Sequence, residues 1–178
     1  THNISDFGFI VGADIKTTNV CNFACAMCNP ADSSLIATDW EKNQQDPYVQ
    51  SQLTTKPQHL DDIKKIYKNK NNYDLLNEIC KQHSLRFLKL LGGEPLLDKN
   101  LQNSLDCVKN KQSLNLMIVT NGSVDIERFV QKNSQIGFFY FTISLEAYKE
   151  YNNYIRKNSD WHQITKNILN AKKLHNVQ

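Results

Sequence analysis

Apolar runs at nearly even spacing constrain the fold of this chain most strongly. Three of them cover residues 85–91, 114–120 and 138–145, and a shorter strand-like stretch lies within residues 8–20. The turn-forming pairs Gly92-Gly93 and Asn121-Gly122 directly follow the first two runs. Strands about 25 residues apart, with helical patterns between them, predict parallel βα units. Because the runs are almost continuously apolar, we expect a sheet that is covered on both faces.

The segments between these runs show the apolar periodicity of helices. The first helix is expected to begin at Pro30, with Asp32 or Ser33 as its cap. Residues 44–58 are polar and contain Pro47 and Pro57, which predicts a loop. Further helices are predicted at residues 59–68, 73–82, 101–108, 126–130 and 161–174, and a fifth strand is expected to open within residues 175–178. Residues 44–84 then form a helical insertion between the first helix and the second strand.

Composition places the chain among ordinary globular proteins. Of its 178 residues, 40% are hydrophobic and 22% are charged, and the formal charge is only +3. The lysines are scattered, so we expect no nucleic-acid partner. No apolar run approaches the length of a membrane span and no signal peptide is visible, so we expect no membrane partner. Because the sequence begins at Thr1 and not at a methionine, we expect a piece of a longer protein.

The cysteines are distributed unevenly. Cys21, Cys25 and Cys28 form a C-x3-C-x2-C run just after the first strand, while Cys80 and Cys107 stand alone. Five cysteines with one tight cluster indicate a metal site in a reducing compartment and not a disulfide framework, so we expect a cytoplasmic protein. Cys80 and Cys107 lie at apolar helix positions, where a cysteine acts as a small hydrophobic residue of the core.

Two kinds of metal site are compatible with the cysteine run. Thiolates hold iron–sulfur clusters, and three local cysteines leave the fourth iron of a [4Fe–4S] cluster free to bind another group. Structural zinc normally takes four ligands in two short pairs, and no histidine stands at a supporting spacing. The run therefore favours iron–sulfur chemistry, with zinc and plain buried thiols as the alternatives.

A second motif follows the strand at residues 85–91. Its residues Gly92, Gly93 and Glu94 precede Pro95, and paired glycines at a strand end let the main chain approach a ligand closely. A tight turn is the other interpretation of this motif by itself.

Together and in this order, the two motifs resemble the radical S-adenosylmethionine superfamily, over roughly residues 13–175. The resemblance implies that Cys21, Cys25 and Cys28 hold a [4Fe–4S] cluster whose free iron binds the amino and carboxylate groups of S-adenosylmethionine. It also implies that Gly92, Gly93 and Glu94 orient the amino group. The expected chemistry is reductive cleavage of S-adenosylmethionine to a 5′-deoxyadenosyl radical, which abstracts hydrogen from a substrate.

Later residues continue the resemblance. Thr120-Asn121-Gly122 is similar to the end of the family's third strand, and Ser144 with Glu146 is similar to the end of its fourth, near the ribose and the methionyl carboxylate. Arg156 resembles an arginine that pairs with that carboxylate. Met27 takes the place of an aromatic residue that lies against the adenine. The cofactor-binding residues implied are therefore Gly92, Gly93, Glu94, Asn121, Ser144, Glu146, Arg156 and Met27.

The resemblance also implies the fold and the partners. We expect an α/β partial parallel (β/α) barrel, with four recognisable βα units of the family's six, in which residues 1–178 form a core domain that is incomplete at its C-terminus. Cys28-Asn29-Pro30 and Trp40 resemble the subgroup with SPASM or twitch extensions, which favours a peptide or protein substrate. A one-electron reductant such as flavodoxin or ferredoxin is implied. A non-catalytic iron–sulfur or zinc-binding module is the alternative function.

Overall fold

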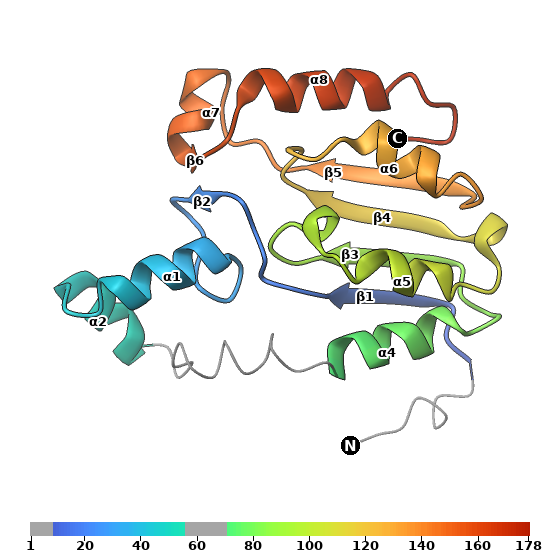
Figure 1. Ribbon diagram of the computed structural model, residues 1–178, viewed down its shortest axis with the longest axis horizontal. Coiled ribbons are helices and arrows are strands. Elements are labelled where there is room, and N and C mark those ends of the chain that lie inside the picture. The colour runs from blue at the N-terminus through green and yellow to red at the C-terminus, as the bar shows by residue number, and fades with distance from the viewer. Residues whose placement is uncertain (1–8, 56–70) are drawn as a thin grey trace.

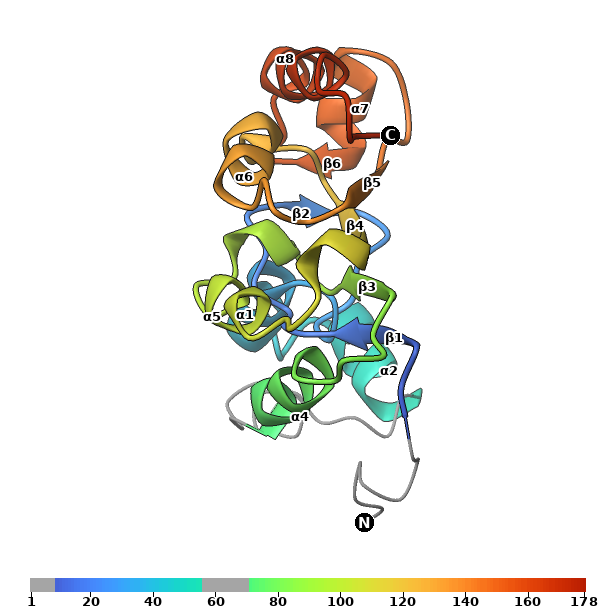
Figure 2. The same ribbon diagram turned by 90° about the vertical axis from the view of Figure 1, so that its right-hand side faces the viewer.

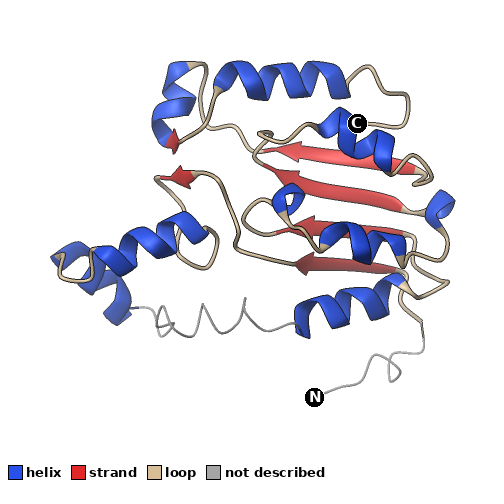
Figure 3. Cartoon of the chain, in the orientation of Figure 1, coloured by secondary structure: helices blue, strands red, loops and turns tan. Residues whose placement is uncertain are grey.

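The fold is built on an open parallel sheet of four strands, seen in a computed structural model that describes residues 9–55 and 71–178 (Figures 1 and 3). The strands are β1 (Gly12–Lys16), β3 (Phe87–Leu91), β4 (Asn115–Thr120) and β5 (Phe138–Ile143), and they pair in the order β1-β3-β4-β5. Each neighbouring pair is parallel and in register, for example Leu90 opposite Ile118. This is the α/β architecture of a partial βα barrel, as the sequence predicted.

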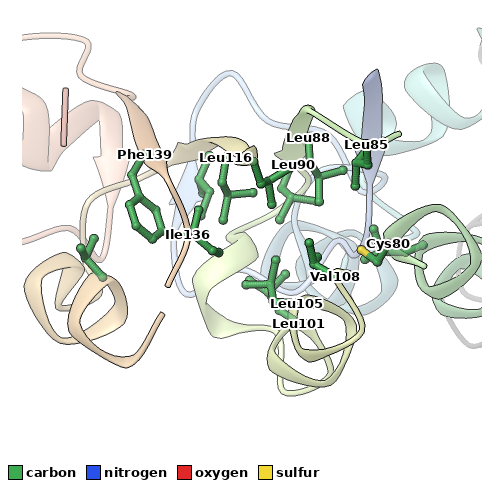
Figure 4. Close-up of a cluster of buried hydrophobic side chains, with 14 of the residues drawn as sticks. Cys80, Leu85, Leu88, Leu90, Leu101, Leu105, Val108, Leu116, Ile136 and Phe139 are labelled. Carbon is green, nitrogen blue, oxygen red and sulfur yellow. The ribbon is translucent and has the colours of Figure 1, made fainter. Parts of the chain in front are cut away.

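Helices cover one face of this sheet. Figures 1 and 2 show α4 (Asn71–Cys80), α5 (Leu101–Asp106) and α6 (Ile126–Lys132) on the same side of the strands. Leu88, Leu90 and Leu116 point into the core beneath them (Figure 4), and Ile118 belongs to the same cluster; all four are 0% exposed. Burying each of these side chains stabilises the fold by about 1.5–3 kcal/mol. Cys80 is buried in this core, as expected.

The opposite face of the sheet is more open than the sequence predicted. Residues alternate along a strand, so those between the core positions lie on the second face. Phe87 there is 39% exposed, and Lys89 forms an ion pair with Asp14 across β3 and β1 at 2.7 Å. The expectation of two covered faces is therefore met on one face only, within the described part of the chain.

The segment after β1 corrects two expectations. α1 (Ser34–Lys42) begins four residues beyond Pro30, and the Ser33 hydroxyl caps it by accepting the Ile36 N–H at 3.4 Å. α2 (Pro47–Thr55) is a helix where a loop was predicted. Asp46 accepts the N–H of Tyr48 at 2.8 Å, so an N-terminal cap and a proline at the first helical position start α2. The helix predicted at residues 59–68 lies outside the described residues.

The chain after β5 returns to the carboxyl ends of the strands. α7 (Glu150–Ile155) leads into β6 (Arg156–Lys157), which pairs antiparallel with β2 (Ala24–Cys25), and α8 (Trp161–Ala171) follows (Figure 1). Two short 3-10 helices, η2 (Pro95–Leu97) and η3 (Lys111–Ser113), complete the described elements. The last residues pair parallel to β5 through a bridge between Phe139 and Val177, which agrees with the predicted opening of a fifth strand.

Within the described residues, none of the helices has the length and apolar character needed to span a membrane.

Candidate functional site

The cysteine run lies at the end of the sheet where all four strands terminate (Figure 1). Cys25 belongs to β2, and the N–H of Cys28 donates to the carbonyl of Cys25 at 3.1 Å, which makes the loop turn tightly. Cys25 is 2% exposed, and Cys21 and Cys28 are half-buried against Phe23 and Ile164. All five cysteines are free thiols. The loop thus gathers three thiols at the strand ends.

The contact between Cys25 and Cys28 shifts the pKa values of both thiols. The Cys25 thiol donates a hydrogen bond to Cys28, which lowers the pKa of Cys28 to about 7 and raises the pKa of Cys25. Burial is the main cause that raises the pKa of Cys21. Because a metal binds thiolates, binding must displace the proton that Cys25 and Cys28 share.

The two glycines after β3 run directly against the chain that leads into the cysteine loop. The N–H of Gly93 donates to the carbonyl of Thr18 at 2.8 Å, and the N–H of Glu94 donates to that of Val20 at 2.7 Å. A Cβ atom at Gly92 would lie 2.4 Å from the Thr18 oxygen, and one at Gly93 would lie 2.4 Å from the Val20 oxygen. The close approach that the glycines permit is therefore an approach to the protein's own main chain.

Glu94 is the most deeply buried charged residue of the site, with 0% exposure. Its carboxylate accepts hydrogen bonds from the Thr120 hydroxyl at 2.8 Å, the Asn121 N–H at 2.6 Å and the Leu96 N–H at 3.1 Å. Burial raises the pKa of Glu94, and these donors lower it again in part. The described contacts of the carboxylate lie within the chain and tie the end of β3 to the end of β4. Its contact with the methionine amino group stays a prediction.

Asn121 joins the end of β4 to the cysteine loop. Its Nδ2 group donates to Asn22 Oδ1 at 2.9 Å and to Cys21 Sγ at 3.8 Å. Its Oδ1 accepts the N–H of Ser123 at 2.9 Å, so the predicted turn at Asn121-Gly122 is formed, with Gly122 at a positive φ of 76°. Asn121 therefore contacts a predicted ligand cysteine.

Arg156 contacts the cysteine loop from β6. It lies directly opposite Cys25 in the β2–β6 pair, and its Nη1 group donates to Cys25 Sγ at 3.7 Å. Its Nη2 group donates to Glu146 Oε1 at 2.6 Å. The structure therefore joins three predicted site residues, although the predicted partner of Arg156 was the methionyl carboxylate.

The remaining predicted residues lie around the same end of the sheet. The N–H of Ser144 donates to the Thr120 carbonyl at 2.9 Å, which places Ser144 just beyond the β4–β5 pair. The N–H of Glu146 donates to Asn152 Oδ1 at 3.1 Å. Met27 is 51% exposed at the tip of the cysteine loop. Asn22 and Asn152 were not predicted as site residues. An asparagine by itself gives no sequence signal that distinguishes a residue bonded within the site from a surface residue.

The three thiols can serve as thiolate ligands of an iron–sulfur cluster or of a zinc ion. A tetrahedral zinc site with Zn–S bonds of about 2.3 Å needs its sulfur atoms about 3.8 Å apart. In residues 9–55 and 71–178, no three histidine, cysteine or acidic side chains group closely enough to hold one ion. A four-iron cluster is wider and takes each thiolate on a different iron. In the same ranges Arg156 Nε is buried without a partner, and a cluster held by three thiolates is an anion that can accept from it.

Comparison with known proteins identifies the class to which this fold and site belong. A sequence profile of the Radical SAM superfamily matches residues 15–177, and the chain therefore belongs to this superfamily. A segment of 66 residues is 32% identical to a probable GTP 3',8-cyclase of Methanococcus maripaludis. That segment is 37% of this chain and 22% of the relative, so the match spans about a fifth of the relative's length.

Proposed function

We propose that this chain is the catalytic core of a radical S-adenosylmethionine enzyme in which Cys21, Cys25 and Cys28 hold a [4Fe–4S] cluster. The observation that carries the proposal is the convergence of the cysteine loop with the ends of β3, β4 and β6. When bound, the reduced cluster supplies the electron that cleaves S-adenosylmethionine to methionine and a 5′-deoxyadenosyl radical, and the radical takes a hydrogen atom from the substrate.

The residues of the chain have distinct parts in this proposal. Gly92 and Gly93 bring main-chain groups next to the cysteine loop, where they orient the methionine amino group. Glu94 supports this arrangement of the glycines, because its carboxylate holds the ends of β3 and β4 together. Ser144 and Glu146 lie on the side of the ribose and the methionyl carboxylate, and Met27 packs against the adenine as a polarisable side chain.

The substrate class rests on a narrower basis. We propose a peptide or protein, on the resemblance of Cys28-Asn29-Pro30 and Trp40 to the SPASM and twitch subgroup. A flavodoxin or ferredoxin is the proposed electron donor. The cytoplasm is the proposed location, where the free thiols stay reduced. The relative's name makes GTP the contrasting substrate, so supplying peptides or GTP to the reduced enzyme separates the two classes.

The test of the function is anaerobic reconstitution with iron and sulfide, followed by reduction in the presence of S-adenosylmethionine. We expect close to four irons and four sulfides per chain and the formation of 5′-deoxyadenosine. Cys25→Ala should lose both, whereas the matched control Cys107→Ala should keep both, since Cys107 caps the C-terminus of α5 and packs against the main core, apart from the cysteine loop.

Three outcomes of this test have different meanings. Zinc without sulfide in the purified protein would contradict the cluster. A normal cluster that never yields 5′-deoxyadenosine would support a non-catalytic iron–sulfur module. Unchanged iron content in Cys25→Ala would show that these cysteines are not the ligands.

A further inference from the structure

The guanidinium group of Arg156 has two partners of opposite character. Its Nη1 group donates to Cys25 Sγ at 3.7 Å, and its Nη2 group donates to Glu146 Oε1 at 2.6 Å. Arg156 is 8% exposed, and its side chain is 10% exposed against 39% for that of Glu146. The cation is therefore buried on the sulfur side and meets its counter-charge on the solvent side.

Backbone pairing fixes the contact between Arg156 and Cys25. The two residues are direct partners in the antiparallel pair of β2 and β6, and the N–H of Ala26 donates to the carbonyl of Ile155 at 2.9 Å. Opposite residues of such a pair have Cβ atoms about 5 Å apart. The guanidinium is thus held next to the sulfur by the ladder itself and not by a chance meeting of two long side chains.

The position of Glu146 is also fixed. Its main-chain N–H donates to Asn152 Oδ1 at 3.1 Å, and Asn152 is 0% exposed at the start of α7. This bond anchors the loop between β5 and α7 next to Arg156, where the Glu146 carboxylate accepts from the guanidinium. The Cys25 sulfur, the guanidinium and the carboxylate form one connected row.

Charges and hydrogen bonds near a ligand sulfur change the reduction potential of an iron–sulfur cluster. A donated N–H or a cation stabilises the reduced state more than the oxidised state, because the reduced cluster carries one more negative charge. An anion behind the cation weakens this effect. Separations of 3.7 Å to the sulfur and 2.6 Å to the carboxylate, in a partly buried site, make both effects large compared with those of solvated surface charges.

We propose that Arg156 tunes the reduction potential of the cluster through Cys25, and that Glu146 sets how much of the arginine charge reaches the sulfur. The inference rests on the proposed function, because it needs the cluster on Cys25. It gives Arg156 a different role from the one that the family resemblance implied, which was pairing with the methionyl carboxylate. The reductant is external, and the cluster takes up one electron without a proton.

The test compares reconstituted wild-type protein with Arg156→Gln by redox titration, read by visible absorption and by the electron paramagnetic resonance of the reduced cluster. At a fixed potential, the ratio of reduced to oxidised cluster should fall about tenfold, which for a one-electron couple is a shift of about 59 mV to more negative potential. Lys157→Gln is the matched control. It removes the same charge from the neighbouring residue of β6, whose side chain is exposed, so screening should keep the ratio within about twofold of wild type.

Glu146→Gln provides the opposite arm. It removes the counter-charge while Arg156 stays, so the ratio of reduced to oxidised cluster should rise. A disrupted site would move both variants in the same direction, which would overturn the inference. If Arg156→Gln assembles no cluster, the redox titration of Glu146→Gln tests the inference by itself.

Affinity for S-adenosylmethionine separates the two roles of Arg156. An unchanged potential in Arg156→Gln together with weaker S-adenosylmethionine binding would overturn the inference and favour pairing with the methionyl carboxylate. A wild-type protein that takes up no iron and sulfide would overturn the proposed function as well. A wild-type cluster with unshifted variants overturns the tuning role alone.

Discussion

The cysteine loop is held at two corners, one at the end of β3 and one in the pair of β2 and β6. At the first corner, Gly92 and Gly93 press main chain against main chain, and the buried Glu94 braces the strand ends with three hydrogen bonds. At the second corner, Arg156 contacts Cys25 through a charged donor and forms an ion pair with Glu146. The comparison indicates that the first corner determines the shape of the loop and the second its electrostatics. Variants at the two corners should therefore differ in kind.

Gly93→Ala should destabilise the first corner and lower the free energy of unfolding more than the other substitutions. A Cβ atom there would lie 2.4 Å from the Val20 oxygen and 2.6 Å from the Asn19 carbon, and neither main-chain atom can move aside freely. We expect the free energy of unfolding of the metal-free protein to fall by about 3 kcal/mol or more. Gly12→Ala is the control, because its nearest contact would be an ordinary 3.7 Å. Equal stability of the two variants in urea titrations would refute the packing argument.

Glu94→Gln should weaken the same corner by a smaller amount. One carboxylate oxygen becomes an NH2 group, so at least one of the donors from Thr120, Asn121 and Leu96 then faces another donor. The expected loss is about 2 kcal/mol in the free energy of unfolding at neutral pH. Gln135→Glu, a change in the reverse sense at an exposed side chain in the turn after α6, serves as a control for the chemistry of the substitution. A loss within experimental error would mean that the carboxylate does not brace the strands.

Glu146→Gln should leave the free energy of unfolding nearly unchanged. Its side chain is 39% exposed, so solvent screens the ion pair with Arg156. We expect a change below about 1 kcal/mol in the free energy of unfolding, shrinking further in high salt. Denaturant titrations at low and high salt measure both quantities. A loss as large as that of Gly93→Ala would show that the second corner also determines the shape of the loop.

Much of the fold could be predicted because its signals are local. The runs at residues 85–91, 114–120 and 138–145 each carry their own strand pattern, and the structure places β3, β4 and β5 inside them. The helix α2 was missed because two prolines and polar residues outweighed the start signal of Asp46 followed by Pro47. That capping pair could have identified the helix.

The site was predictable in its residues but not in its contacts. The spacing of Cys21, Cys25 and Cys28 marks the loop by itself. The pairing of Cys25 with Arg156 could not be predicted, since a strand of two residues has no periodicity and its partner lies 131 positions away. Glu94 was expected to face a ligand because the family resemblance implied it, and its full burial has no signal in the sequence, since charged side chains are seldom fully buried. Only the structure shows the donors that make its burial tolerable.

The separation between Cys25 and Arg156 has a consequence for how this protein is made. Its cysteines leave the ribosome before the arginine that shields Cys25, which is 131 residues further along the chain. At about 5–20 residues per second, the thiols wait about 7–26 s before β6 can pair with β2. During synthesis the loop is therefore open to oxidants and to the wrong metals. Cluster insertion is expected to follow completion of the β2–β6 pair, and not the first appearance of its ligands.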